Sequence, residues 1–160
     1  MSKISKVSKK VKILNSDCDY KDVNNVLHII YTDNIPEDVI EIADIYEGKI
    51  KNRIGINFPM NIVDKYKGDS NIKKYNCDYI IVYKKGDKLT KEHELMHAKY
   101  YMDEKYKEKV KNIWKDMEDK NKDKVKKMLK KMGYPENEDI LIDEFQAYYY
   151  TEKTNFFGKF

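Results

Sequence analysis

The run His93-Glu94-Leu95-Met96-His97 constrains the fold of this chain more than any other feature of the sequence. Side chains four residues apart share one face of an α-helix, so a helix here would place the two imidazoles side by side. Such a pair can bind one zinc ion, and Glu94, one step round the helix, can reach a water on that ion. The alternative is a pair of surface histidines on an amphipathic helix.

The surrounding sequence predicts that this run is helical. A β-branched segment, 77–84, reads as a strand and ends at a Gly-Asp turn. From Thr90, which is a plausible N-cap, the sequence pattern has the period of a helix. This helix is expected to end or bend around residues 103–107.

A catalytic zinc site usually has three protein ligands and one open position, so a third ligand must come from elsewhere. Glu144 is the favoured candidate, because it lies on a separate predicted helix that can pack across the first. Asp103 is the alternative, because its spacing matches the last ligand of an HExxHxxGxxH/D pattern, although Tyr100 stands at the glycine position. On a continuing helix, Asp103 would point about 120° away from His93. Either carboxylate could instead be an ordinary surface acid.

Further elements are expected on both sides of the motif. Before it, the pattern predicts strands at 26–32 and 54–58, with a helix between them that starts near Pro36 and stops at Gly48. After it, apolar stripes predict a lysine-rich helical region, and Gly133 and Pro135 end that region. The stripe residues are Val110, Trp114, Met117, Val125, Met128, Leu129 and Met132. A final helix is expected over about 137–151, followed by an aromatic tail that could pack back on the body.

HELMHA and DEFQAYYY together resemble the two metal-binding helices of gluzincins, zinc metallopeptidases with an HExxH motif and a distant glutamate. The resemblance covers roughly residues 77–150. It implies that His93, His97 and Glu144 bind zinc. It also implies that a zinc-activated water hydrolyses peptide bonds, with Glu94 as the general base. It also implies an α+β, zincin-like fold with a small mixed sheet, an active-site helix and a C-terminal helix that carries the third ligand. The expected organisation is a flexible basic tail over residues 1–10 and a single zincin-like domain over 11–160.

Several other residues are candidates for roles around the metal. Asp143 is a natural hydrogen-bond partner for a ligand histidine. Tyr148, four residues after Glu144, is the favoured donor to the oxyanion, and Tyr134 and Tyr100 are other options. If the strand at 77–84 is the sheet edge, an extended peptide could add to it through main-chain hydrogen bonds.

Composition narrows the range of functions that the sequence allows. The 160 residues carry a net charge of only +4, and Arg53 is the only arginine among 32 basic residues. Arginine is the residue that best recognises phosphate and guanine, so nucleic-acid binding is disfavoured, and the lysine-rich stretch 105–131 is expected to be a solvated face. Besides the peptidase, two functions stay open: a catalytically silent zincin-fold binding module and a lysine-rich nucleic-acid-binding protein. If the protein is a peptidase, its expected partner is a peptide or protein substrate.

The sequence shows neither a secretory signal nor a stretch of about 20 apolar residues that could span a membrane. The expected location is therefore intracellular, in the cytoplasm or inside a viral particle. Cys18 and Cys77 are far apart and form no CxxC motif, so both are expected to be reduced thiols. His28 is expected to be a satisfied strand histidine, because no other candidate ligand flanks it.

Overall fold

The computed structural model describes residues 18–152 and 156–158, which form a mixed α+β fold. The expected basic tail, residues 1–10, lies outside the described residues. The chain divides into two compact units, the first ending at Glu94 and the second beginning at Leu95. We predicted a single domain over residues 11–160, and whether the two units form one domain stays a prediction.

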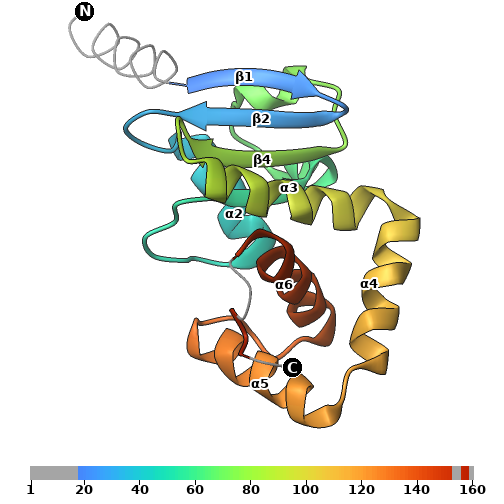
Figure 1. The fold of residues 1–160 in the computed structure, drawn as a ribbon. Coiled ribbons are helices and arrows are strands. Elements are labelled where there is room, and N and C mark those ends of the chain that lie inside the picture. The colour runs from blue at the N-terminus through green and yellow to red at the C-terminus, as the bar shows by residue number, and fades with distance from the viewer. Residues whose placement is uncertain (1–17, 153–155, 159–160) are drawn as a thin grey trace, which may run out of the picture. The chain divides into compact units, whose positions relative to one another are not determined.

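The first unit contains a four-stranded mixed sheet (Figure 1). The strands are β1 (Cys18–Val23), β2 (Val26–Tyr31), β3 (Ile56–Pro59) and β4 (Tyr79–Lys84). Their order is β1-β2-β4-β3; β2 and β4 are parallel, whereas the two outer pairs are antiparallel. The predicted strands at 26–32, 54–58 and 77–84 correspond to β2, β3 and β4, but Ile54 is exposed and precedes β3. The prediction of a small mixed sheet is confirmed.

Strand β1 was not expected, although a two-residue turn marks it. Asn24 and Asn25 both have positive φ, 51° and 69°, and Val23 pairs with Val26 on either side of them. Such a turn favours residues that tolerate positive φ at both positions, and asparagine is one of them. Along β1, most side chains are exposed, so the strand lacks the apolar alternation that identifies the others.

Peptide addition to residues 77–84 was considered on the condition that this strand is the sheet edge, and that condition is not met. Strand β4 lies between β2 and β3, and it pairs with both. Its side chains are buried as far as Tyr83, which is typical of a central strand covered on both faces. The edges are β1 and β3, so a peptide that adds to this sheet would pair with one of those two strands.

One helix and the only arginine support the first unit. Helix α2 (Glu37–Glu47) buries Val39, Ile42 and Ala43 and ends at Gly48, as predicted. Arg53 holds this end of the helix: its guanidinium bonds to Asp44 at 2.5 Å and to the carbonyl oxygen of Gly48 at 2.7 Å. A third bond reaches Glu47, and the Arg53 side chain is only 6% exposed. These bonds fix the loop that leads into β3.

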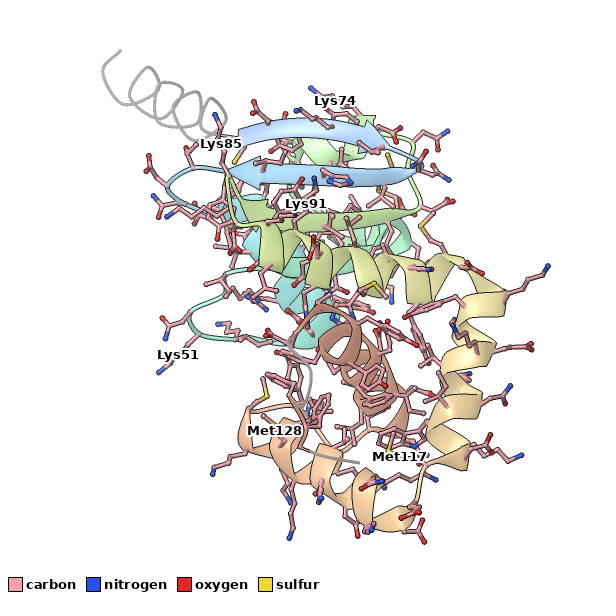
Figure 2. The ribbon with its side chains drawn as sticks, in the orientation of Figure 1. Lys51, Lys74, Lys85, Lys91, Met117 and Met128 are labelled. Atoms are coloured by element: carbon pink, nitrogen blue, oxygen red, sulfur yellow. The ribbon has the colours of Figure 1, made fainter. Side chains whose placement is uncertain are left out.

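The core of the first unit lies around the sheet. It includes Leu27, Ile29, Phe58, Ile80 and Val82, with two short 3₁₀ helices, η1 (Met60–Lys65) and η2 (Asn71–Lys74), packed beside it. Cys18 and Cys77 are buried in the same core, and both are thiols that form no disulfide within the described residues, as expected. Lysines of this unit, such as Lys51 and Lys74, are exposed and point away from the ribbon (Figure 2).

Helices make up the second unit. After the last turns of α3 (Lys88–Met102), they are α4 (Glu104–Asp116), α5 (Asp119–Lys131) and α6 (Glu138–Thr151). Helices α4 and α5 both contact α6, which Figure 1 draws in dark red. Of the predicted stripes, Val110, Trp114, Val125 and Leu129 are buried, whereas Met132 is exposed because it follows the end of α5.

The aromatic tail packs on this helical core, as expected, for the part of it that is described. Phe156 stacks on Tyr148 with ring centroids 4.9 Å apart, and buried Phe157 contacts Phe145 at 5.7 Å. No helix within the described residues is long and apolar enough to cross a membrane.

Candidate metal centre

Helix α3 carries the HELMH run and begins earlier than predicted. Its first residue is Lys88, and the carboxylate of Asp87 accepts bonds from the Thr90 backbone N–H at 3.1 Å and the Thr90 hydroxyl at 2.6 Å. Asp87 therefore caps the helix, and the expectation that Thr90 is the N-cap is wrong. Aspartate satisfies the free N–H groups of a first turn as well as threonine does, so the two residues compete for this position. The helix continues without a break through His97 to Met102.

The structure brings three candidate ligands together. His93 and His97 lie one turn apart on α3, and Glu144 lies on α6. One nitrogen from each histidine and one carboxylate oxygen of Glu144 all lie within 4.8 Å of one another. His97 is almost fully buried, whereas His93 and Glu144 are partly exposed. This group could hold a metal ion, with its buried end at His97.

His97 lies between two carboxylates of α6. Its Nε2 is 3.2 Å from Glu144 Oε1, and its Nδ1 is 2.9 Å from Asp143 Oδ1. Burial lowers the pKa of His97, but the charges of Glu144 and Asp143 outweigh burial and hold that pKa well above its ordinary value. The two carboxylates thus favour a positive charge at this position. A proton or a metal cation can supply that charge, which fits a site where a ligand histidine is oriented by a carboxylate.

Gln146 is a part of this arrangement that the sequence reading missed. Its side chain is fully buried, and its Nε2 donates to the Asp143 carboxylate at 3.0 Å and to the carbonyl oxygen of Met96 at 3.1 Å. Its Oε1 accepts a bond from the Tyr106 hydroxyl at 2.6 Å. Gln146 therefore ties α6 to α3 and α4 and fixes Asp143. The available signal was a lone amide in the run DEFQAYYY, three residues after Asp143.

We expect the Asp143→Asn substitution to weaken metal binding about 10- to 100-fold, because the His97 imidazole loses a charged acceptor that orients it. The affinity can be measured by competition with a chromogenic chelator. Asp139→Asn, an exposed change on the same helix, serves as the matched control and should leave the affinity unchanged. Equal affinities for the Asp143→Asn variant and the wild type would show that this carboxylate plays no part in the site.

Glu94, the predicted base, also lies on α3 and is 6% exposed. Its Oε2 accepts a hydrogen bond of 2.8 Å from the side-chain amide of Asn57, a residue of β3 that the sequence reading did not consider. The carboxylate is therefore fixed by a contact within the first unit. A base needs a defined position relative to the proton it accepts, and this contact supplies one.

Asp103, the alternative third ligand, has another role. Helix α3 ends at Met102, and the Asp103 carboxylate caps α4 by accepting a bond of 3.1 Å from the Tyr106 backbone N–H. It does not belong to the group formed by His93, His97 and Glu144. Glu104 is exposed at the start of α4, with its carboxylate 3.9 Å from Lys107.

The three candidate tyrosines differ in their surroundings. The hydroxyls of Tyr148 and Tyr134 are 2.8 Å apart. Burial, the charge of Glu144 and the bond to Tyr148 all raise the pKa of Tyr134, so its hydroxyl stays protonated and lies beside the Glu144 carboxylate. Tyr100 is buried in the helical core, and burial and nearby Asp143 raise its pKa to about 12. Tyr134 and Tyr148 are therefore the tyrosines placed near Glu144, and Tyr148 as the oxyanion donor stays a prediction.

His28 lies apart from the candidate ligands. It is buried on β2, and its Nδ1 is 2.9 Å from the Tyr83 hydroxyl on β4. Burial, and then the charges of Lys91 and Lys21, lower its pKa, so the imidazole is neutral at physiological pH. The expectation of a satisfied strand histidine is met at Nδ1 but not at Nε2, which is buried and has no hydrogen-bond partner among the described residues.

Comparisons with known proteins do not identify the chain: no protein-family model, no curated protein and no solved structure matches it.

Proposed function

We propose that this protein is a zinc-dependent metallopeptidase of the gluzincin type. The observation that supports the proposal is the group of His93, His97 and Glu144, whose ligand atoms lie within 4.8 Å of one another. Two imidazoles and one carboxylate are the protein donors of known catalytic zinc sites that hydrolyse peptides. Asp143 beside His97 adds the carboxylate partner that such ligand histidines usually have.

Zinc fits this donor set better than the other common metals. Calcium and magnesium prefer sites made wholly of oxygen ligands, whereas imidazole nitrogens suit zinc and the later transition metals. When bound, zinc would lower the pKa of a water ligand to about 7 and polarise the scissile carbonyl.

The protein's own residues would do the rest of the chemistry. Glu94 accepts the proton of the attacking water and passes it to the leaving amine. Its position next to His93 on α3 gives it access to that water, as in other HExxH helices. Tyr148, or its hydrogen-bonded neighbour Tyr134, donates to the oxyanion. A donor of this kind is worth roughly 10²–10³ in rate.

An extended peptide is the substrate that the sheet favours. Strand β3 is an edge strand, and it carries Asn57, whose amide contacts Glu94. A peptide that pairs with an edge strand gains main-chain hydrogen bonds and needs few side-chain contacts. We therefore propose β3, in place of β4, as the strand that binds substrate.

Metal removal tests the proposal. The purified protein should contain one equivalent of zinc and should cleave peptides in a degenerate fluorescence-quenched library. Dialysis against a chelator should abolish cleavage, and one equivalent of zinc should restore it. The protein ligands remain without the metal, whereas the water that attacks the peptide is no longer activated. Mass-spectrometric metal analysis and product sequencing supply the readouts. Cleavage that survives complete removal of the metal would contradict the proposal.

A further inference from the structure

The carboxylate of Glu94 is held from outside its own helix. Asn57 lies in the middle of β3, and its Nδ2 is 2.8 Å from Glu94 Oε2. A hydrogen bond from a neutral amide to a carboxylate fixes the direction of the carboxylate plane, because the donor must lie near one oxygen's lone pairs. Oε2 of Glu94 therefore accepts a hydrogen bond from within the protein.

A second bond fixes the orientation of the Asn57 amide. The Tyr79 hydroxyl on the neighbouring strand β4 donates to Asn57 Oδ1, and the Tyr79 side chain is buried. If the amide were turned over, its oxygen would face the Glu94 carboxylate, and two acceptors would meet without a proton. The Tyr79 hydroxyl therefore selects the amide orientation that lets Asn57 donate to Glu94.

Gly55 lets the segment leading into β3 approach this carboxylate. A β-carbon at position 55 would lie 2.7 Å from Glu94 Oε1 and 2.6 Å from Thr90 Cγ2. Both distances are too short for real contacts, so only glycine fits unless the helix or its side chains move. The same short segment thus supplies the hydrogen-bond donor for one oxygen of Glu94 and passes close to the other.

We propose that Asn57 is the positioning residue of the catalytic base, and that Tyr79 acts through it. The inference rests on the proposed peptidase function. Asn57 holds the Glu94 carboxylate in the orientation from which it takes the proton of the attacking water. Its loss should therefore lower kcat and leave both KM and zinc affinity unchanged, because it binds neither the metal nor the substrate's side chains.

The first experiment tests the contact without requiring activity. Asn57→Leu keeps the side-chain shape and removes the donor, and its effect on thermal unfolding is measured alone and combined with Glu94→Leu in zinc-free protein. The Tm losses should be clearly non-additive, because each variant removes the same bond. Asn61→Leu, an exposed amide on η1, is the matched control and should be additive with Glu94→Leu. Additive losses for Asn57→Leu would overturn the inference.

The second experiment measures turnover. Asn57→Leu should lower kcat about 10- to 100-fold, which is the cost of misplacing a reacting group by roughly 1 Å. Asn57→Asp should be worse, because it keeps the acceptor for Tyr79 but places a second negative charge against Glu94. Tyr79→Phe should fall between the wild type and Asn57→Leu. Unchanged kcat in Asn57→Leu, or a rise in KM or a loss of zinc that accounts for its reduced activity, would overturn the inference.

The two proposals fail in different ways. If the wild type binds zinc but hydrolyses no peptide, the peptidase function fails, and the positioning role fails with it even though the Tm losses are coupled. If the wild type is active and Asn57→Leu is equally active, the peptidase function stands and only the positioning role fails.

Discussion

Replacing Glu94 by glutamine should abolish peptide hydrolysis and leave zinc bound. The substitution keeps the size of the side chain and the hydrogen-bond acceptor for Asn57, but an amide cannot take a proton from water. General-base catalysis contributes roughly 10²–10⁴ in rate, so we expect kcat to fall by about that factor. Because Glu94 is not a ligand in the proposed site, the zinc content should stay at one equivalent.

The measurement is a turnover assay on a cleaved peptide, combined with metal analysis of the same preparation. Glu92→Gln is the matched control, because Glu92 is an exposed carboxylate on the same helix and should be replaceable without loss. Full activity in Glu94→Gln would remove Glu94 from the mechanism. Lost zinc in that variant would instead show that Glu94 binds the metal.

The Glu144→Gln substitution should have the second large effect, on metal binding itself. Losing an outer carboxylate partner typically costs roughly 10- to 100-fold in affinity, and losing a ligand should cost more than about 100-fold. The amide also removes one of the two negative charges that face His97. Zinc at 1,000 times its dissociation constant stabilises a folded protein by about 4 kcal/mol, so zinc-dependent stabilisation of the wild type should be large and that of the variant small.

Thermal unfolding with and without zinc reads out this effect, and Glu108→Gln, an exposed change on α4, is the matched control. The control should retain the full stabilisation by zinc. Equal stabilisation of Glu144→Gln and the wild type would show that Glu144 is not a ligand and would reopen the search for the third donor.

The parts of the site that could be predicted are those set by local geometry. The spacing of His93 and His97 determines their proximity once the segment is helical. The helix of Glu144 was predicted from its own periodicity, and a carboxylate on it was the natural complement to two histidines. Asp103 was an alternative ligand on the spacing of a pattern in which the helix turns, because on a continuing helix it would point away from His93. The chain does end α3 at Met102, but it uses Asp103 to cap α4.

The parts that could not be predicted depend on residues that are distant in the sequence. Asn57 and Glu94 are 37 residues apart, and only the pairing of β3 with β4 determines which residues face α3. The order of the strands likewise depends on long-range pairing, so the edge position of β3 was not accessible from residues 56–59 alone. Gln146 forms its bonds to α3 and α4 only when three helices meet.

Arg53 has a practical consequence for work on this protein. Every other basic side chain is a lysine, so reagents that modify amines would alter nearly the whole positive surface in one step. The guanidinium bonds to Asp44, Glu47 and Gly48 would be untouched, because guanidinium groups do not react under those conditions. Reductive methylation should therefore change the solubility and crystallisation behaviour of the protein while the loop before β3 keeps its conformation.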